Sequence, residues 1–260
     1  MEWFVAHAWL AATVSNPSDQ SSPDGLAANA VVYGLGNLGP SWVGESPLTA
    51  DVATDAIRPS SAVFVLVCDA SDDSEITLRR GTRASPGTLV TTFAKCWPAN
   101  VWIGFSEVTA DTSSWVLSID DPSGTVSDPA TVEVKFFGIA PRVALFSAAG
   151  ASIGRPAQTR TPADLSTHAQ SQLGADFAAE QPTLHTQAMQ VYAHDDETAL
   201  GLLRRAIHAV KTVRPILSCT DKDTATSYGN TVLGRLPALP VEQVEPGMMV
   251  GFALSVVEML

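Results

Sequence analysis

The sequence predicts an α+β fold, in which a β-rich N-terminal region with the form of a sandwich or barrel precedes a small α/β sheet domain with one main amphipathic helix. Three observations lead to this prediction. Short apolar segments separated by turn residues fill the first half of the chain, one helical apolar repeat stands in the second half, and the C-terminal end is apolar. We place the two regions at residues 1–137 and 138–260.

The N-terminal region is expected to consist mainly of strands. Residues 1–14 are apolar enough for a short buried helix or strand, and residues 16–25 form a loop rich in Pro, Ser, Asp and Gly. The segments that follow are short, are bounded by turn residues and have almost no helical periodicity, which is typical of a β-sandwich or barrel. The strands expected are Ala30–Tyr33, Val63–Cys68, Ile76–Arg80, Leu89–Phe93, Val101–Phe105, Trp115–Ile119, Val132–Phe137 and Val143–Phe146.

A strand followed by a helix is the clearest signal in the C-terminal region. Apolar and polar residues alternate from His185 to Ala193, which predicts a strand. Acidic residues suited to a helix N-terminus follow, and then an apolar stripe at helical spacing from Ala199 to Val213. Arg214-Pro215 ends the helix, because the residue before a proline avoids the helical region.

The remaining C-terminal segments are less regular. Residues 148–181 are weakly patterned, with a poor helix expected at 164–177, and Ile216–Tyr228 is expected as a polar loop. Short strands are expected at Thr231–Leu233 and Pro240–Val244. The tail Met248–Leu260 is apolar on both alternating faces, which predicts a strand buried on both sides, in the same sheet as Met189–Ala193.

The overall charge limits the classes of partner. The 260 residues carry a net charge of -12, and only 16% of them are charged. An acidic surface suits neither duplex DNA nor an anionic membrane, since phosphate binding requires clustered Lys and Arg. No run reaches the roughly 18 apolar residues of a membrane span. We therefore expect a soluble protein, made in a cytoplasm, that also buries surface against copies of itself or other proteins.

Two short motifs in the sequence could be either binding sites or structural turns. Gly34–Gly39 reads G-x-G-x-x-G, but Pro40 and Gly44 follow and no helical stripe begins there, so a glycine-rich loop is favoured over a dinucleotide site. His194, Asp195 and Asp196 could hold a divalent ion or act as a base, but a helix cap beside a turn histidine is the favoured interpretation.

The other candidate ligands are interpreted as structural. Cys68, Cys96 and Cys219 are far apart and are expected to be reduced thiols. The acidic cluster lacks the regular spacing of a calcium loop and is expected to be a solvated turn, formed by Asp69, Asp72, Asp73 and Glu75. We therefore predict no catalytic residue, no metal and no cofactor.

Residues 138–260 resemble the tail-terminator and tail-completion (neck) proteins of long-tailed bacteriophages. The resemblance lies in the Pro-Arg strand Ile139–Phe146, in the strand and acidic turn Leu184–Asp196, and in the closing segment Val244–Leu260. The chain differs from that family in the added β region 1–137 and in lacking the helix that such proteins often place first.

The resemblance implies a non-enzymatic virion protein, assembled in the host cytoplasm. Such proteins form rings, commonly of six copies, that join the tail tube to the head connector while DNA passes through the opening. DNA would be a passing cargo only, and an acidic wall suits that role because it repels phosphates.

Two alternatives stay open, together with a set of contact residues. The chain could be another viral coat or decoration protein, or a small hydrolase or metal enzyme that uses His185, His194 and Asp195. If it forms a ring, the expected contact segments are 148–180 and 218–229, and deletion of 218–229 is expected to leave the fold nearly intact and to impair oligomerisation. The individual contact residues expected are Arg204, Arg205, Lys211, Asp221, Lys222 and Asp223.

Overall fold

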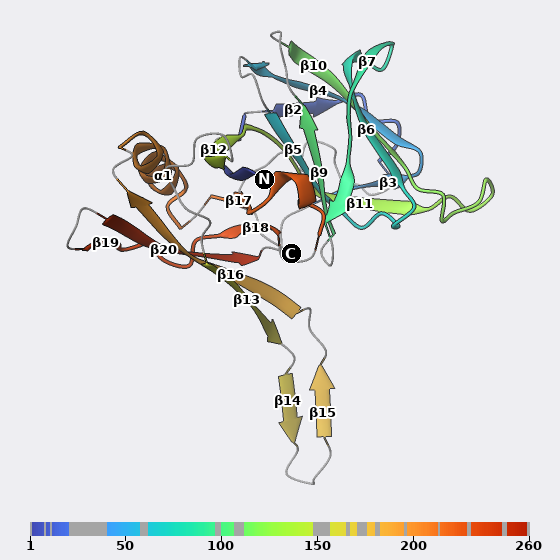
Figure 1. Cartoon of the computed structure of the whole chain (residues 1–260). Coiled ribbons are helices and arrows are strands. Elements are labelled where there is room, and N and C mark those ends of the chain that lie inside the picture. Colours follow the sequence, from blue (N-terminus) through green and yellow to red (C-terminus); the bar gives the residue numbers. More distant parts are fainter. Residues whose placement is uncertain are drawn as a thin grey trace.

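In the residues that the structure describes, the protein folds as three larger antiparallel sheets, one α-helix and a separate two-stranded hairpin (Figure 1). The computed structural model describes residues 2–7, 9–10, 12–20, 41–57, 62–96, 100–106, 112–147, 157–164, 167–170, 176–179, 183–194, 197–212, 214–227, 230–245 and 249–258. The expected strand at 30–33 and the G-x-G-x-x-G segment lie outside these residues. The strand-rich character expected of the N-terminal region is confirmed.

Two five-stranded sheets form a sandwich from the first half of the chain. The outer sheet contains, in spatial order, β2 (Ala12–Ser15), β4 (Leu48–Ile57), β10 (Thr112–Asp120), β6 (Glu75–Thr82) and β7 (Ser85–Thr92). The middle sheet contains β3 (Trp42–Glu45), β11 (Thr131–Pro141), β5 (Ala62–Cys68), β9 (Val101–Ser106) and β8 (Ala94–Cys96).

The middle sheet is covered on both faces, which explains its most apolar strand. All seven residues of β5 are buried. Phe64 and Leu66 face the outer sheet, where the rings of Phe64 and Trp115 lie 5.6 Å apart, whereas Val63 and Val65 belong to a second core shared with the remaining large sheet. A strand buried on both faces loses the alternation of a half-exposed strand and reads as a continuous apolar run.

The third sheet, which we call the long sheet, has eight strands. Its order is β12 (Val143–Ser147), β1 (Glu2–Ala6), β17 (Ile216–Cys219), β18 (Thr231–Arg235), β20 (Met249–Glu258), β16 (Thr183–His194) and β13 (Ala157–Asp164), and β19 (Glu242–Glu245) pairs with β20. The N-terminal strand β1 thus lies in a sheet built otherwise by the second half of the chain. The division at residues 137 and 138 stays a prediction.

The helix α1 (Glu197–Val210) packs against one face of the long sheet. Its buried residues Leu203, Ala206 and Val210 share a core with Trp3 and Met189, while the other face of β1 meets the middle sheet through Phe4. The predicted strand–helix unit is confirmed, and so is the pairing of the C-terminal strand with β16, which places Phe252 opposite Val191.

Two predictions for the C-terminal half are wrong. The poor helix expected at 164–177 is replaced by the end of β13 and by β14 (Thr167–Gln170) and β15 (Asp176–Ala179), because the segment lacks an apolar repeat of 3.6 residues that could bury one helical face. The polar loop expected at 216–228 begins with β17, whose four residues are all buried, with the Ser218 hydroxyl 3.7 Å from Met189 Sδ.

Candidate assembly site

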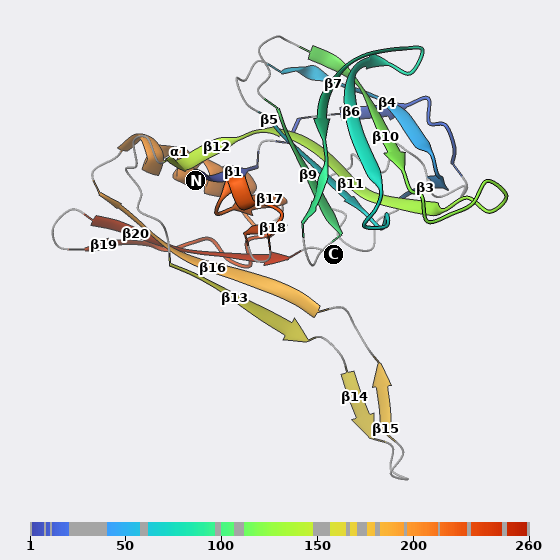
Figure 2. The ribbon, with the colours of Figure 1, turned by 45° about the vertical axis from the view of Figure 1, so that its right-hand side comes forward.

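A two-stranded hairpin, which we call the arm, projects from the long sheet. Its strands β14 and β15 pair with each other, with Thr167 opposite Ala179 and Gln170 opposite Asp176, and among the described strands they have no other partner. Figures 1 and 2 show the arm extending away from the rest of the protein in both views. Isolated two-stranded hairpins are at best marginally stable in water, so this arrangement favours a partner for the arm.

The base of the arm is a regular ladder. β13 and β16 pair over eight positions, from Ala157 opposite Gln190 to Asp164 opposite Thr183, and β13 is the edge strand of the long sheet. Pro162 lies in β13, where a proline is tolerated because an edge strand has one side without ladder hydrogen bonds. The arm lies beyond this end of the ladder, and its strands run at an angle to β13 and β16 in Figures 1 and 2.

A buried polar cluster joins three strands near this base. Glu258 of β20 accepts hydrogen bonds from the backbone N–H of His185 at 2.9 Å and contacts His185 Nδ1 at 2.8 Å. Arg160 Nη2 of β13 lies 3.9 Å from Glu258 Oε1. Glu258 is 6% exposed and His185 is 8% exposed. The cluster therefore fixes the pairing of β13, β16 and β20 where the arm leaves the sheet.

The residues of the enzyme alternative are not brought together. His185 lies near the start of β16 and His194 is its last residue. At about 3.3 Å per residue, they are about 30 Å apart, too far to act on one small substrate. Asp195 lies outside the described residues.

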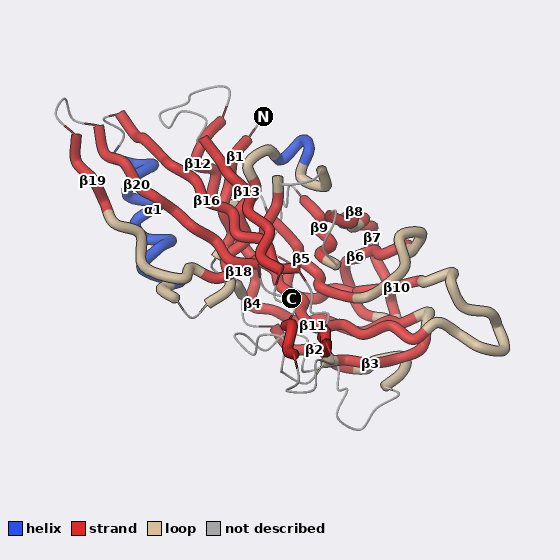
Figure 3. Tube along the Cα trace, turned by 90° about the horizontal axis from the view of Figure 1, so that it is seen from below, coloured by secondary structure: helices blue, strands red, loops and turns tan. Residues whose placement is uncertain are grey.

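The six predicted contact residues fall on two separate surfaces. Arg204 and Arg205 are exposed on α1, and Lys211 is exposed just after it with a φ of 51°. The other three lie at the 3-10 helix η3 (Lys222–Thr224), where the Asp221 carboxylate accepts a hydrogen bond from Asp223 N–H at 3.3 Å. Figure 3 shows α1 and η3, the two blue segments, well apart.

The expected tolerance to deletion of 218–229 is wrong. Ser218 and Cys219 are fully buried in β17, which pairs with β1 on one side and β18 on the other. Lys222 also lies over the ring of Phe105, with Nζ 5.8 Å from the ring centroid. Removing residues 218–229 would delete half of β17, a strand in the interior of the long sheet. The segment is therefore needed for the fold, whether or not it also contacts another molecule.

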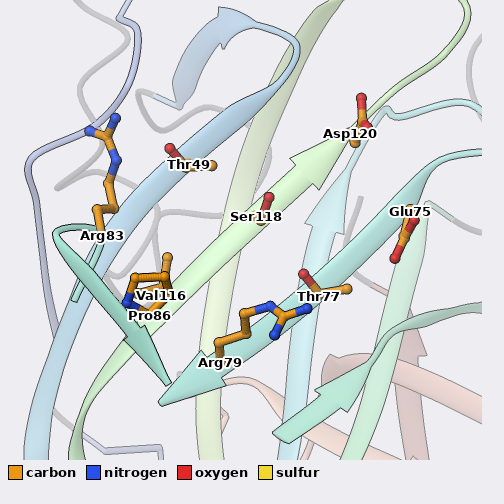
Figure 4. Close-up of a pocket in the computed structure, with 9 residues that line it drawn as sticks. All are labelled: Thr49, Glu75, Thr77, Arg79, Arg83, Pro86, Val116, Ser118 and Asp120. Carbon is orange, nitrogen blue, oxygen red and sulfur yellow. The ribbon is translucent and has the colours of Figure 1, made fainter. Parts of the chain in front are cut away.

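The outer sheet carries a polar hollow that sequence reasoning missed. Figure 4 shows its floor, formed by the hydroxyl groups of Thr49, Ser118 and Thr77, which stand opposite one another on three adjacent strands. Arg79 and Arg83 line the hollow together with Glu75 and Asp120, and its volume is about 390 Å³. The hollow depends on the register of three strands far apart in the chain, so no local motif indicates it.

The cysteines and acidic residues that were predicted to be structural are buried or make hydrogen bonds and ion pairs within the protein. Cys68, Cys96 and Cys219 are all buried thiols, and burial raises the pKa of Cys68 and of Cys96 to about 12. Asp69 accepts a hydrogen bond from Glu133 N–H at 2.7 Å, and Asp72 forms an ion pair with Lys95. Within the described ranges, no group of three His, Cys, Asp or Glu residues is placed to hold a metal ion.

Comparison with family models, with curated proteins and with solved structures finds no match to this chain. In the part of the chain that the structure describes, no helix combines the length and the apolar character needed to cross a membrane.

Proposed function

We propose that this protein is a non-enzymatic virion assembly protein that forms a ring with copies of itself. In this role, which its resemblance to tail-terminator and neck proteins implies, the ring joins a tail tube to a head connector in the virion. DNA passes through the opening without specific binding, and the net charge of -12 supports this because negative walls repel phosphates.

The arm is the observation that carries the proposal. Among the described strands, these two four-residue strands pair only with each other, and a two-stranded hairpin has little stability of its own. A neighbouring molecule supplies what such a hairpin lacks. The ladder of β13 and β16 holds the base of the arm in the long sheet, so each copy presents the arm outside its own sheets to a neighbouring copy.

Electron microscopy of the purified protein tests the proposal, with a variant that lacks only the arm. Asp164 and Thr183 are register partners, so replacing residues 165–182 with Asn-Gly closes β13 and β16 through a two-residue turn. The matched control places Asn-Gly at Val126-Ser127, the exposed tip between Thr125 and Asp128, which also stand opposite each other.

The intact protein and the control are expected to form rings, and the armless variant is expected to remain monomeric with an unchanged circular dichroism spectrum. A monomeric intact protein would contradict the proposal. So would rings that persist in the armless variant.

A further inference from the structure

The hollow on the outer sheet has its charged side chains sorted by sign. Glu75 and Asp120 stand opposite each other on β6 and β10, on one side of the row of hydroxyl groups that forms the floor. Arg79 lies on the other side of that row, two residues beyond Thr77 on the same face of β6 (Figure 4). The hollow therefore offers carboxylates at one end, a guanidinium group at the other and hydroxyl groups between them.

The polar side chains of the hollow are not used by the fold. In the part of the chain that the structure describes, Glu75, Asp120 and Arg79 form no ion pair and no side-chain hydrogen bond. The Thr77 hydroxyl has no hydrogen-bond partner among the described residues either, although Thr77 is only 9% exposed and lines the hollow. Because polar groups in such positions are nearly always hydrogen-bonded, the partner of this hydroxyl belongs inside the hollow.

The acidic end carries a pair of like charges that costs the sheet stability. Like charges directly opposite each other on antiparallel strands repel, and Glu75 and Asp120 are register partners. On the turn before β6, by contrast, Asp72 is neutralised by an ion pair with Lys95. A ligand cation between Glu75 and Asp120 would remove their repulsion and form charge-assisted hydrogen bonds with both carboxylates.

At the basic end, Arg79 is the cation that is available to a ligand. The Arg83 guanidinium donates a hydrogen bond to the backbone oxygen of Asn16, and the Arg83 backbone N–H donates to Asp51 Oδ1 at 2.6 Å. The planar guanidinium of Arg79 is suited to bind a carboxylate through two parallel hydrogen bonds. Since two arginines and two acids line the hollow, a simple anion or cation is not favoured, whereas a ligand with one charge of each sign is.

We propose that the hollow binds a small zwitterionic amino carboxylate, with its ammonium group between Glu75 and Asp120 and its carboxylate on Arg79. Glu75 and Arg79 are four residues apart on β6, so their Cα atoms are about 13 Å apart at about 3.3 Å per residue, which favours a ligand whose charges are separated by a short chain. The volume of about 390 Å³ lies within the range of about 300–1,000 Å³ that is typical of small-ligand sites. This site goes beyond the proposed assembly role, since the arm leaves the long sheet and the hollow lies on the outer sheet.

Ligand-observed NMR titrations of the intact chain test this proposal with matched probes. 4-Aminobutyrate, 6-aminohexanoate and 8-aminooctanoate carry both charges at different spacings, whereas the amine and the carboxylate of the same chain length carry only one charge each. At least one of the three is expected to bind about 10-fold more tightly than both of its single-charge counterparts, because it forms charge-assisted hydrogen bonds at both ends.

The variants locate the binding. Glu75→Gln/Asp120→Asn and Arg79→Gln are each expected to weaken the binding of that probe about 10-fold. The control Lys135→Gln removes an exposed cation from β11 in the middle sheet and is expected to bind as the intact protein does. All the substituted side chains are exposed, so the circular dichroism spectra are expected to stay unchanged.

Two results would overturn the inference. If no amino carboxylate binds more tightly than its single-charge counterparts, the hollow is not a site for a zwitterion. If the variants in the hollow bind the probe as tightly as Lys135→Gln does, the probe binds elsewhere. Neither result bears on ring formation, which electron microscopy of the armless variant tests separately.

Discussion

At the scale of single residues, Asp121 shows how a buried charge holds the sandwich together. Its carboxylate accepts hydrogen bonds from Ser71 N–H at 2.9 Å, from the Ser71 hydroxyl at 2.6 Å and from Ser123 N–H at 2.9 Å. Burial alone would raise the pKa of Asp121, but these hydrogen bonds outweigh it and lower the pKa to about 2. The side chain thereby ties the turn after β5 to the end of β10.

This pKa makes stability depend on acid pH. An aspartate has a pKa of about 3.9 in the unfolded chain, so the ionised Asp121 stabilises the fold fully above about pH 4 and loses that contribution as the pH falls to about 2. Asp121→Asn is expected to lower the free energy of unfolding by about 2 kcal/mol at neutral pH and to flatten its dependence between these pH values. Urea unfolding measures both, with the exposed Asp120→Asn as a control that changes stability by less than about 0.5 kcal/mol.

At the scale of elements, two glycines differ in the space available for a side chain, one in the strand β18 and one in the helix α1. A Cβ at Gly234 of β18 would lie 2.1 Å from the backbone oxygen of Val257, whereas a Cβ at Gly201 of α1 would meet nothing within 4 Å. Gly234→Ala is therefore expected to destabilise the protein by more than about 2 kcal/mol, because the β18–β20 ladder must shift. Gly201→Ala is expected to stabilise it by up to about 1 kcal/mol. Thermal unfolding that lowers the Tm for both variants would contradict this account of α1.

The elements that sequence predicts are those whose signal is local. α1 and β5 were predictable because one carries a complete apolar stripe and the other a continuous apolar run. β17 was not, because four residues are too few to show a period and its burial depends on β1 and β18, which lie on either side of it. The arm was missed for a related reason, since its strands have only four residues each and, among the described strands, pair with each other alone.

At the scale of the whole molecule, the layers are tied together by segments that pass between them. β1 carries the N-terminal end into the long sheet, and β11 runs through the middle sheet directly before β12. The long sheet thus forms a firm base for both α1 and the arm. The candidate assembly surfaces could be predicted only in part: the cations of α1 were named from sequence, whereas the projection of the arm depends on the ladder of β13 and β16.

The central claim is that the arm becomes stable only against another molecule, and hydrogen–deuterium exchange of peptides from residues 165–182 tests it most directly. We expect these amides to exchange rapidly in dilute, monomeric protein and to be protected at least 10-fold in the assembled particle, while β5 is protected equally in both. Rapid exchange of the arm in the assembled particle, or equal protection in the monomer, would contradict the account.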